Sequence, residues 1–320
     1  MDDSVLDCLI VGGGPAGLTA AIYLARFHLD ILVVDGGKSR ASWIPCTHNH
    51  AGFPDGISGD ELLQRMRDQA CKYGAKIQTE YVTKLERDEE SGHFCVVWGS
   101  GSRRARTVLL ATGVSNRRPP MDEELHDEAL SKGLIRYCPI CDGYEVTDKK
   151  VGVIGSDSHG VAEAIFIRSY TADVTLIAPD KALNLKPEDQ ARLKEAGIHC
   201  IDGPAQAAAI SHEFIVVDTA EGHHTFDSVY PALGSDTHTQ LGEMVGAQLA
   251  DDGCFLCDSH QRTSVPGLYA AGDVVHGLDQ ISHAMGEGGV AATTIRNDLC
   301  TETPRWREAT REMEEAEEGS

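Results

Sequence analysis

The sequence predicts an α/β protein that contains two Rossmann-like units. Residues 5–35 and residues 151–177 each run from an apolar strand through a glycine-containing turn into an apolar helix and a second strand. This order is the β-α-β plan that is typical of nucleotide-binding parallel sheets. A chain of 320 residues is long enough for two domains of this kind.

The first unit carries a complete dinucleotide fingerprint. A predicted strand over residues 5–11 leads into the turn GGGPAG at residues 12–17, and the helix that follows offers free N–H groups to phosphates. The glycine spacing allows a tight bend, a close approach of the pyrophosphate and close packing of helix on strand. The second strand, residues 31–34, ends at the acid that would bind a ribose hydroxyl. The predicted dinucleotide contacts are Gly12, Gly14, Pro15, Ala16, Gly17 and Asp35.

The second unit keeps this plan but has a damaged fingerprint. Residues 151–154 are predicted as a strand, residues 161–167 as a helix and residues 173–177 as the next strand. Asp157 replaces the middle glycine and places a negative charge where a pyrophosphate would lie. The segment at 178–180, Ala-Pro-Asp, has no arginine for a 2′-phosphate. The sequence therefore argues against tight NADPH binding and leaves only weak binding of NADH open.

The segment CPICD at residues 138–142 lies between the two units. Thiols at this spacing can close and reopen a disulfide, and the thiolate is the reactive species. Pro139 suits the first position of a helical turn, whose free N–H groups would lower the pKa of Cys138. Asp142 is placed to hold the proton that a leaving thiolate needs. We predict a redox-active pair, Cys138 and Cys141, with Asp142 as acid–base partner.

Two other interpretations of this pair are half of a zinc site and two unrelated cysteines. Zinc normally has four ligands, and no second C-x-x-C or H-x-x-x-H lies at finger spacing. The two nucleotide-binding units that flank the pair also favour redox chemistry over a metal site.

The prolines and glycine of residues 43–54 predict a loop, which a helix over residues 58–73 follows. Cys46, His48 and His50 alternate in this loop, as metal ligands do in some sites. The favoured interpretation is that they are polar groups near the cofactor. No metal site is predicted.

Residues 81–87, 93–98 and 107–111 are predicted as strands, the last ending at Thr112 and Gly113. A cluster of basic side chains precedes that last strand. Its members are Arg103, Arg104 and Arg106. A phosphate site is one interpretation of this cluster, and a solvated strand edge is the favoured one.

The C-terminal third supplies further elements. Residues 254–257, Cys-Phe-Leu-Cys, are interpreted as part of a strand, where the two sulfurs would point to opposite faces and stay apart. Residues 268–273 are predicted as a strand that ends in Gly-Asp, and residues 286–297 as a helix whose glycine-rich start has free N–H groups. The tail at 304–320 is acidic and helix-prone, typical of a frayed surface helix.

Composition limits the partners and the compartment. A net charge of −22 argues against binding to nucleic acid or anionic membranes. The start of the chain has no basic segment typical of a signal peptide, and no run of about 18 apolar residues could span a membrane. The ten cysteines are too sparse for a disulfide scaffold. These features predict a cytoplasmic protein.

Taken together, these motifs resemble the low-molecular-weight thioredoxin reductase family over nearly the whole chain. The turn at 12–17 matches its FAD fingerprint, and residues 111–113 match its A-T-G strand. Residues 138–142 match the redox C-x-x-C-D, and residues 269–274 match the motif that binds the ribityl chain. Gln280 and Ile281 stand where the family has R-Q-A, with Asp279 in place of the arginine.

The resemblance implies an FAD-binding domain split between residues 1–117 and 237–320, the second part including the acidic tail. An NAD(P)-like domain at 118–236, which carries the cysteine pair, would be inserted between them. Cys141 would lie against the flavin and Cys138 would exchange with the substrate. A homodimer and a swing of the inserted domain are also implied. Further expected FAD contacts are Asn49, Thr112, Gly113, Gly272, Asp273, Gln280 and Ile281.

The resemblance therefore implies an FAD-dependent disulfide oxidoreductase that reduces a thioredoxin-like protein or a small disulfide. The family's G-x-G-x-x-A and H-R-R signatures for NADPH are both missing here. Some branches with this loss take electrons from ferredoxin, and others are dithiol oxidases that pass electrons to O2. In the oxidase alternative, His48 or His50 would serve as a base. A flavin-bound redox sensor is a third alternative.

Overall fold

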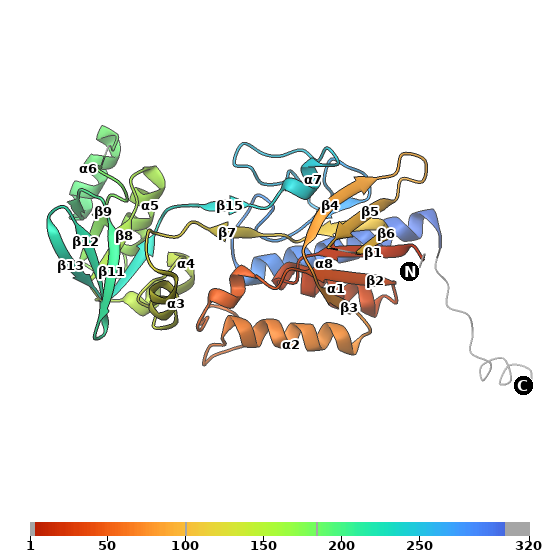
Figure 1. Ribbon diagram of the computed structural model, residues 1–320, viewed down its shortest axis with the longest axis horizontal. Coiled ribbons are helices and arrows are strands. Elements are labelled where there is room, and N and C mark those ends of the chain that lie inside the picture. The colour runs from red at the N-terminus through yellow and green to blue at the C-terminus, as the bar shows by residue number, and fades with distance from the viewer. Residues whose placement is uncertain (1–3, 100, 184, 305–320) are drawn as a thin grey trace, which may run out of the picture.

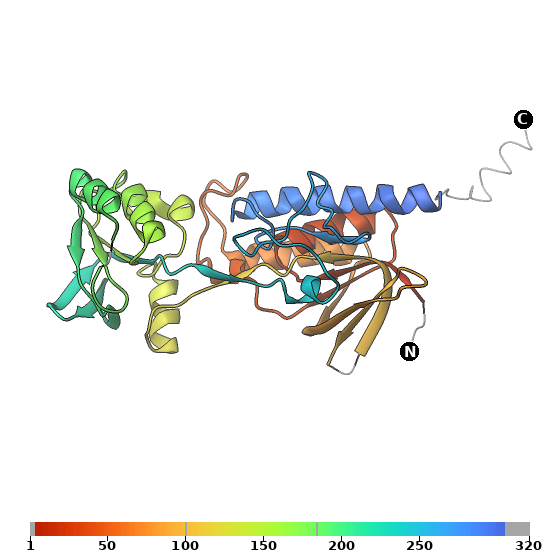
Figure 2. The ribbon, with the colours of Figure 1, turned by 90° about the horizontal axis from the view of Figure 1, so that it is seen from above.

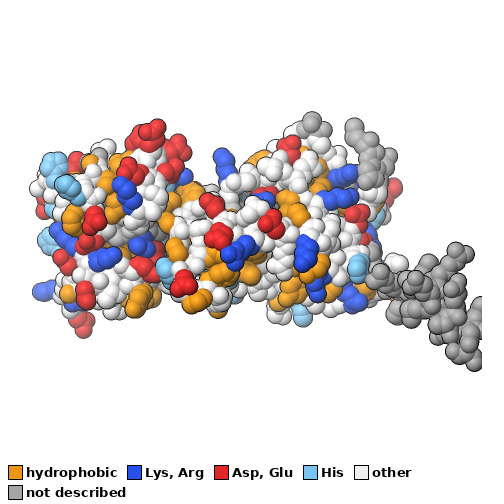
Figure 3. All heavy atoms as spheres, turned by 90° about the horizontal axis from the view of Figure 1, so that it is seen from below, with side chains coloured by type: hydrophobic (Ala, Val, Ile, Leu, Met, Phe, Trp, Pro, Cys, Tyr) orange, Lys and Arg blue, Asp and Glu red, His pale blue; other side chains and the backbone are white. Residues whose placement is uncertain are grey.

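The structure, a computed structural model, describes residues 4–99, 101–183 and 185–304. It has two lobes arranged along the long axis of the molecule and joined by extended segments (Figure 1, Figure 2). Acidic and basic side chains are intermixed over both lobes on the face seen in Figure 3. The predicted helix in the acidic tail lies outside the described residues, apart from its first position.

The larger lobe is built on a seven-stranded sheet in the order β3-β2-β1-β6-β5-β4, with β16 also paired to β6. Its inner strands are buried apolar runs, as expected for parallel strands covered on both faces. Strands β4 and β5 extend it as an antiparallel meander. The strands are β1 (Leu6–Val11), β2 (Ile31–Asp35), β3 (Lys76–Thr79), β4 (Val82–Arg87), β5 (Phe94–Trp98), β6 (Gly101–Leu110) and β16 (Leu268–Ala270).

Helix α8 brings the end of the chain back onto the beginning, because it packs along α1 (Figure 2). A Cβ atom on Gly288 would lie 2.3 Å from the carbonyl oxygen of Ala16, so only glycine allows this approach. The helices of this lobe are α1 (Pro15–Arg26), η1 (Arg40–Trp43), α2 (Gly59–Lys72), α7 (Gln240–Glu243) and α8 (Ile281–Glu302).

The smaller lobe holds a four-stranded parallel sheet in the order β10-β9-β8-β14 and a separate three-stranded antiparallel sheet. Its apolar cores are independent of those of the larger lobe. The strands are β8 (Val151–Ile154), β9 (Val174–Ile177), β10 (His199–Ile201), β11 (Gln206–Ser211), β12 (Phe214–Thr219), β13 (Gly222–Phe226) and β14 (Ser228–Pro231). The helices are α3 (Glu123–Ser131), α4 (Pro139–Asp142), η2 (Gly143–Val146), α5 (Ser158–Ile167) and α6 (Pro187–Ala196).

The two lobes are joined by a pair of antiparallel strands, β7 (Val114–Asn116) and β15 (Ser235–Thr237). The chain leaves the larger lobe through β7 and returns to it through β15, so the second Rossmann-like unit is inserted in the first. This confirms the predicted fold class. The domain limits at residues 117 and 236 stay a prediction, although both fall beside this strand pair.

Three predicted elements need correction. Helix α8 begins at Ile281 rather than at residue 286, so the glycines at its expected start lie inside the helix and their N–H groups are not free. Helix α5 begins at Ser158, three residues early, because Asp157 caps it. The segment at 254–257 is not a strand: only Phe255 forms isolated bridges, to Leu249 and Val275.

The arginine cluster lies in the first half of β6. Strand β6 begins at Gly101 and lies between β1 and β5, but β1 pairs with it only from Ala105 onward. Among the described strands, Arg103 and Arg104 therefore pair with β5 alone, at an open edge of the sheet, which agrees with the favoured interpretation. Arg104 donates to the Ser91 hydroxyl at 3.2 Å, and Arg106 lies 3.6 Å from the Asp7 carboxylate. In the described part of the chain, no helix is both long and apolar enough to cross a membrane.

Candidate active site

A cavity of about 1190 Å³ lies where the two lobes meet, and its walls come from both. This is larger than the roughly 300–1,000 Å³ of most small-molecule pockets, as a dinucleotide requires. Of the predicted site residues, only Gly17 does not line it. The lining includes Gly12, Gly14, Pro15, Ala16, Asp35, Asn49, Thr112, Gly113, Cys138, Cys141, Asp142, Gly272, Asp273, Gln280 and Ile281.

The glycine turn leaves the start of α1 open to a phosphate. Gly14 is the N-cap residue and offers no side chain to the first amides of the helix, while Pro15 begins it. Gly12 has a φ of 107°, which favours glycine. A Cβ on Gly17 would lie 2.0 Å from the Gly12 carbonyl oxygen, which explains why Gly17 packs behind the cavity wall. The turn therefore fits the pyrophosphate of FAD.

The carboxylate at the end of β2, that of Asp35, is held in place by a salt bridge and a hydrogen bond. Asp35 pairs with Arg67 of α2 and accepts a hydrogen bond from the Gly37 amide at 3.2 Å. It is buried at the cavity wall. This places a fixed carboxylate on the side of the glycine turn where a ribose hydroxyl is expected.

A pair of carboxylates lies near the start of α8. Arg40 contacts Asp273 at 3.1 Å and Asp279 at 2.7 Å. Burial, and the negative charge of Asp279, raise the pKa of Asp273, while Arg40 opposes the rise. Glu287 accepts a hydrogen bond from the Gly272 amide at 2.7 Å and so fixes the turn that carries Asp273. Arg40 and Glu287 were not predicted from the sequence, although Asp279 in place of the family's arginine is a signal that a cation must come from elsewhere.

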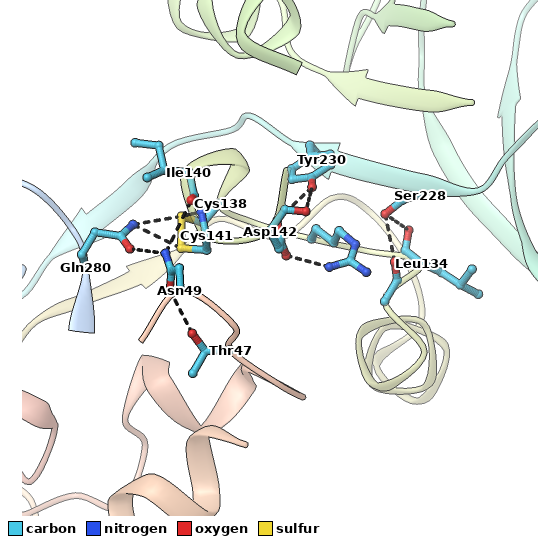
Figure 4. A network of polar contacts seen from close by, with 12 residues as sticks. Thr47, Asn49, Leu134, Cys138, Ile140, Cys141, Asp142, Ser228, Tyr230 and Gln280 are labelled. Atoms are coloured by element: carbon cyan, nitrogen blue, oxygen red, sulfur yellow. Dashed lines mark hydrogen bonds and ion pairs between the residues drawn. A yellow bond between two sulfur atoms is a disulfide. The ribbon is translucent and has the colours of Figure 1, made fainter. Parts of the chain in front are cut away.

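The cysteine pair forms a disulfide in the wall of the same cavity. The side-chain amide of Gln280 donates toward the sulfurs of Cys138 and Cys141, at 3.3 Å and 3.2 Å (Figure 4). Asn49 donates to the Gln280 oxygen at 3.0 Å, and Thr47 donates to Asn49 at 3.0 Å. Residues of the larger lobe thus hold the disulfide against the start of α8.

The predicted helical turn at the pair is present as α4, which begins at Pro139. Cys138 is its N-cap residue, and its sulfur accepts from the Cys141 amide at 3.2 Å. An N–H group that points at this sulfur stabilises a thiolate there once the disulfide is reduced.

Asp142 is held by two partners from its own lobe. Arg136 contacts one carboxylate oxygen at 3.0 Å, and the Tyr230 hydroxyl donates to the other at 2.8 Å. Burial raises the pKa of Asp142, while both partners oppose the rise. The direction of this shift suits a group that must hold and release a proton. The sequence carried no signal for Arg136 or Tyr230.

The three alternating side chains of the loop at residues 43–54 do not all reach the cavity. Cys46 and His48 line the cavity, whereas His50 points at Ser282, with 3.1 Å between its Nδ1 and the Ser282 hydroxyl. Burial lowers the pKa of His50. Among the residues that the structure describes, no group of three or more His, Cys, Asp or Glu side chains is placed to hold a metal.

The second C-x-x-C is not a redox pair in this structure. Cys254 and Cys257 are both free thiols. Burial raises the pKa of the Cys257 thiol to about 12, which makes it a poor nucleophile.

The helix start in the second Rossmann-like unit is capped by a side chain of its own. The Asp157 carboxylate accepts from the amides of His159 and Gly160, at 3.1 Å and 3.0 Å. These are the N–H groups that a pyrophosphate would need at the start of α5. Next to these amides, the Ser158 hydroxyl donates to the Asp189 carboxylate at 2.9 Å, and Arg192 pairs with the same carboxylate at 3.1 Å.

An aromatic cluster joins the lobes beside the cavity. Trp43 of the larger lobe lies 5.6 Å from His126 and 5.7 Å from Tyr137, between ring centroids. Arg118 lies over the Trp43 ring at 4.5 Å. His126 and Tyr137 are hydrogen-bonded to each other, with 2.8 Å between Nε2 and the hydroxyl oxygen. The two rings that contact Trp43 are therefore held together.

Trp43→Ala is expected to weaken the contact between the lobes by about 1–3 kcal/mol, since two aromatic contacts and one cation–π contact are lost. Small-angle scattering and proteolysis of the connecting segments measure this loss as a more open molecule. Phe166→Ala is the matched control, because its ring packs on Tyr170 within the smaller lobe. A Trp43 variant that is as compact as the parent protein and as resistant to proteolysis would contradict the role of the cluster in joining the lobes.

Comparison with known proteins identifies the family of the chain. The family model described as pyridine nucleotide-disulphide oxidoreductase matches residues 6–288. A thioredoxin reductase from Mycolicibacterium smegmatis is 31% identical over 307 residues, which cover 90% of this chain and 95% of that protein.

Two solved structures share the whole architecture. Thioredoxin reductase from Streptococcus pyogenes aligns with a TM-score of 0.84 at 28% identity, covering 94% of this chain and 100% of its own. Lactococcus lactis thioredoxin reductase, described as the FR conformation, aligns with a TM-score of 0.59 at 25% identity, covering 92% and 99%. The chain therefore belongs to the pyridine nucleotide-disulphide oxidoreductases, within the low-molecular-weight thioredoxin reductase family, and is an FAD-dependent disulfide oxidoreductase.

Proposed function

We propose that the chain passes two electrons between FAD and the Cys138–Cys141 disulfide, and between that pair and the disulfide of a thioredoxin-like protein or small molecule. The observation that carries this proposal is the position of the disulfide, which shares one cavity with the open glycine turn of α1. When bound, FAD supplies a two-electron carrier in that cavity.

The exchange with the substrate uses the residues of this chain. The Cys138 thiolate attacks the substrate disulfide, breaks its S–S bond and forms a mixed disulfide. Cys141 then attacks the Cys138 sulfur, which closes the internal disulfide and releases the substrate as a dithiol. Asp142 takes up and gives back the proton that moves with each thiol. The pair is oxidised as the substrate is reduced, so the electrons balance.

A swing of the inserted domain is part of this proposal, because the disulfide now faces the cavity and must also reach a protein substrate. The β7–β15 strand pair is a narrow connection that permits such a motion. The lower TM-score of the relative in the FR conformation supports a second arrangement of the same two domains.

Anaerobic mixing of the purified flavoprotein with candidate donors tests the function. Rapid bleaching by NADPH, NADH or reduced ferredoxin, followed by reduction of thioredoxin, is the result expected of a reductase. Bleaching by a dithiol alone, with recovery in air and peroxide formation, would instead show a dithiol oxidase. Slow responses to every donor and acceptor would show a redox sensor.

NADPH is expected to bind weakly, because Asp157 already occupies the amides at the start of α5. Calorimetric titration should give no saturation at micromolar nucleotide. Asp157→Gly frees those amides and removes a charge, so it should strengthen NADH binding by roughly tenfold at some cost in helix stability. A micromolar dissociation constant for NADPH in the parent protein would overturn this prediction.

We also propose a homodimer in the cytoplasm. Apolar side chains are exposed together on the α1–α8 face of the larger lobe, where a second copy can bury them. They are Tyr23, Phe27 and Val290, exposed by 44%, 38% and 40%. Eight cysteines outside the redox pair are free, which suits a reducing compartment. Light scattering after gel filtration tests the dimer.

A further inference from the structure

The hydroxyl group of Tyr230 has two acceptors within reach, and both belong to Asp142. It lies 2.8 Å from the Oδ1 carboxylate oxygen and 3.3 Å from the backbone carbonyl oxygen of the same residue (Figure 4). The tyrosine is fully buried on β14. Burial and the neighbouring carboxylate raise the pKa of Tyr230, so the phenol keeps its proton and acts as a donor.

The backbone of the smaller lobe brings these groups together. The segment before α4 is added to β14 as a short parallel bridge, from Ile135 to Val229. Arg136 donates its amide to the Val229 carbonyl at 2.9 Å, and the Ser228 hydroxyl donates to the Gly133 carbonyl at 2.9 Å. The positions of Arg136 and Tyr230 are therefore set by hydrogen bonds of the main chain, independently of Asp142.

Arg136 completes the arrangement on the other carboxylate oxygen. Its Nη1 lies 3.0 Å from Oδ2 of Asp142, while its own side chain is 18% exposed. The two oxygens of Asp142 thus have different partners: a permanent cation on one and a neutral hydroxyl group on the other.

We propose that Tyr230 and Arg136 are positioning residues that keep the Asp142 carboxyl group in one place in both of its protonation states. In the carboxylate form, Tyr230 donates to Oδ1 and Arg136 donates to Oδ2. In the acid form, the proton sits on Oδ1 and is donated to the Tyr230 oxygen, whose own hydrogen turns to the Asp142 carbonyl. The carboxyl group can then gain or lose a proton without losing a partner. This inference rests on the acid–base role proposed above for Asp142.

Other titratable groups lie around this site. Glu145 of η2 raises the pKa of Asp142 through its negative charge, although burial is the larger cause. On α5, which packs against α4, His159 and Glu163 pair with each other at 3.1 Å. None of these groups replaces a partner of Asp142, so the Tyr230 and Arg136 contacts are the ones to test.

The test is reduction of the Cys138–Cys141 disulfide in the flavoprotein by dithiothreitol, which becomes a cyclic disulfide as the pair becomes two thiols. The rate is followed by acid quenching and thiol alkylation from about pH 5 to about pH 9. Tyr230→Phe removes one hydroxyl and keeps the ring. It is expected to slow the reaction by roughly tenfold. The limb of the pH–rate profile whose midpoint reports the pKa of Asp142 should move to higher pH, since the carboxylate loses a donor.

Arg136→Met should move the same limb in the same direction, because a cation beside the carboxylate is lost, and Arg136→Lys should restore part of the shift. These variants also carry the test if the Tyr230 variant does not fold. Thr107→Val is the matched control: it removes another buried hydroxyl, which donates to the Asp7 carbonyl oxygen at 2.7 Å and does not line the cavity. Its pH profile should match that of the parent protein.

Asp142→Asn distinguishes the acid–base role of Asp142 from the positioning role of Tyr230 and Arg136. If it abolishes the limb while Tyr230→Phe and Arg136→Met leave the limb in place, the positioning role is wrong and the acid–base role stands. If Asp142→Asn has the parent profile, the proposed role of Asp142 fails, and the positioning role fails with it. Loss of rate in the Tyr230 variant without any shift of the limb would also overturn the inference, because a merely structural defect has that result.

Discussion

Cys138→Ser is expected to give a folded flavoprotein that no longer reduces any disulfide. A serine hydroxyl is a far weaker nucleophile than a thiolate, and it cannot share a disulfide with Cys141. Turnover should therefore fall by about 10³-fold or more. The flavin should remain bound, because the cofactor contacts predicted at the glycine turn lie on the other lobe. Absorbance of the bound flavin and the rate of thioredoxin reduction measure the two effects separately.

The companion variant Cys141→Ser should behave differently. Cys138 can still attack a substrate, but no second thiol resolves the mixed disulfide, so a covalent adduct with the partner should accumulate. Mass spectrometry of that adduct would identify the partner. Cys71→Ser is the control, since this thiol is exposed on α2 away from the cavity. Full turnover by Cys138→Ser would remove the exchange role from this residue.

The parts of the site that follow from local chemistry were predictable. The turn at residues 12–17 and the turn at α4 depend on neighbouring residues, so spacing alone predicts them. The start of α8 was placed five residues late, because its glycines look like a helix start in a sequence. In the fold, Gly288 is pressed against Ala16 of the neighbouring helix, so its lack of a Cβ serves packing, whereas Gly286 is exposed.

The partners of Asp142 and Asp273 could not be predicted in the same way. Tyr230 reaches Asp142 across 88 positions of the chain, and Arg40 reaches Asp273 across 233. Such contacts depend on how strands pair and how the lobes meet. Neither leaves a periodic pattern in the sequence, since one tyrosine in a buried strand looks like any other core residue.

The two Rossmann-like units differ in what caps the helix after the first strand. Helices α1 and α5 both follow a parallel strand and both begin at a turn with glycines. At α1 the N-cap residue is Gly14, and the first amides are left for a phosphate. At α5 the N-cap residue is Asp157, and its carboxylate takes the same amides. One side chain thus converts a phosphate site into a self-capped helix.

Gly14→Asp should make the first unit behave like the second. The backbone at this position is extended, with φ at −81°, so an aspartate fits it without backbone strain. Its Cβ would lie 3.3 Å from the Ser39 hydroxyl, which must move slightly to make room. Its carboxylate would cap α1 as Asp157 caps α5, which should stabilise the apoprotein by roughly 0.3 kcal/mol, since glycine is itself a tolerable N-cap residue. The same carboxylate would meet the pyrophosphate of FAD, and like charges at contact distance should weaken flavin binding by two or more orders of magnitude, roughly 3 kcal/mol or more.

The expected product is a soluble, colourless protein that melts no lower than the parent apoprotein and does not turn yellow on reconstitution with FAD. Gly17→Ala is the contrasting variant: its Cβ would lie 2.0 Å from the Gly12 carbonyl, so it should lower the melting temperature itself. A Gly14→Asp protein that binds one FAD per chain would show that the pyrophosphate lies elsewhere. A Gly14→Asp protein that fails to fold would contradict the capping argument, because the extended backbone at position 14 already suits an aspartate N-cap.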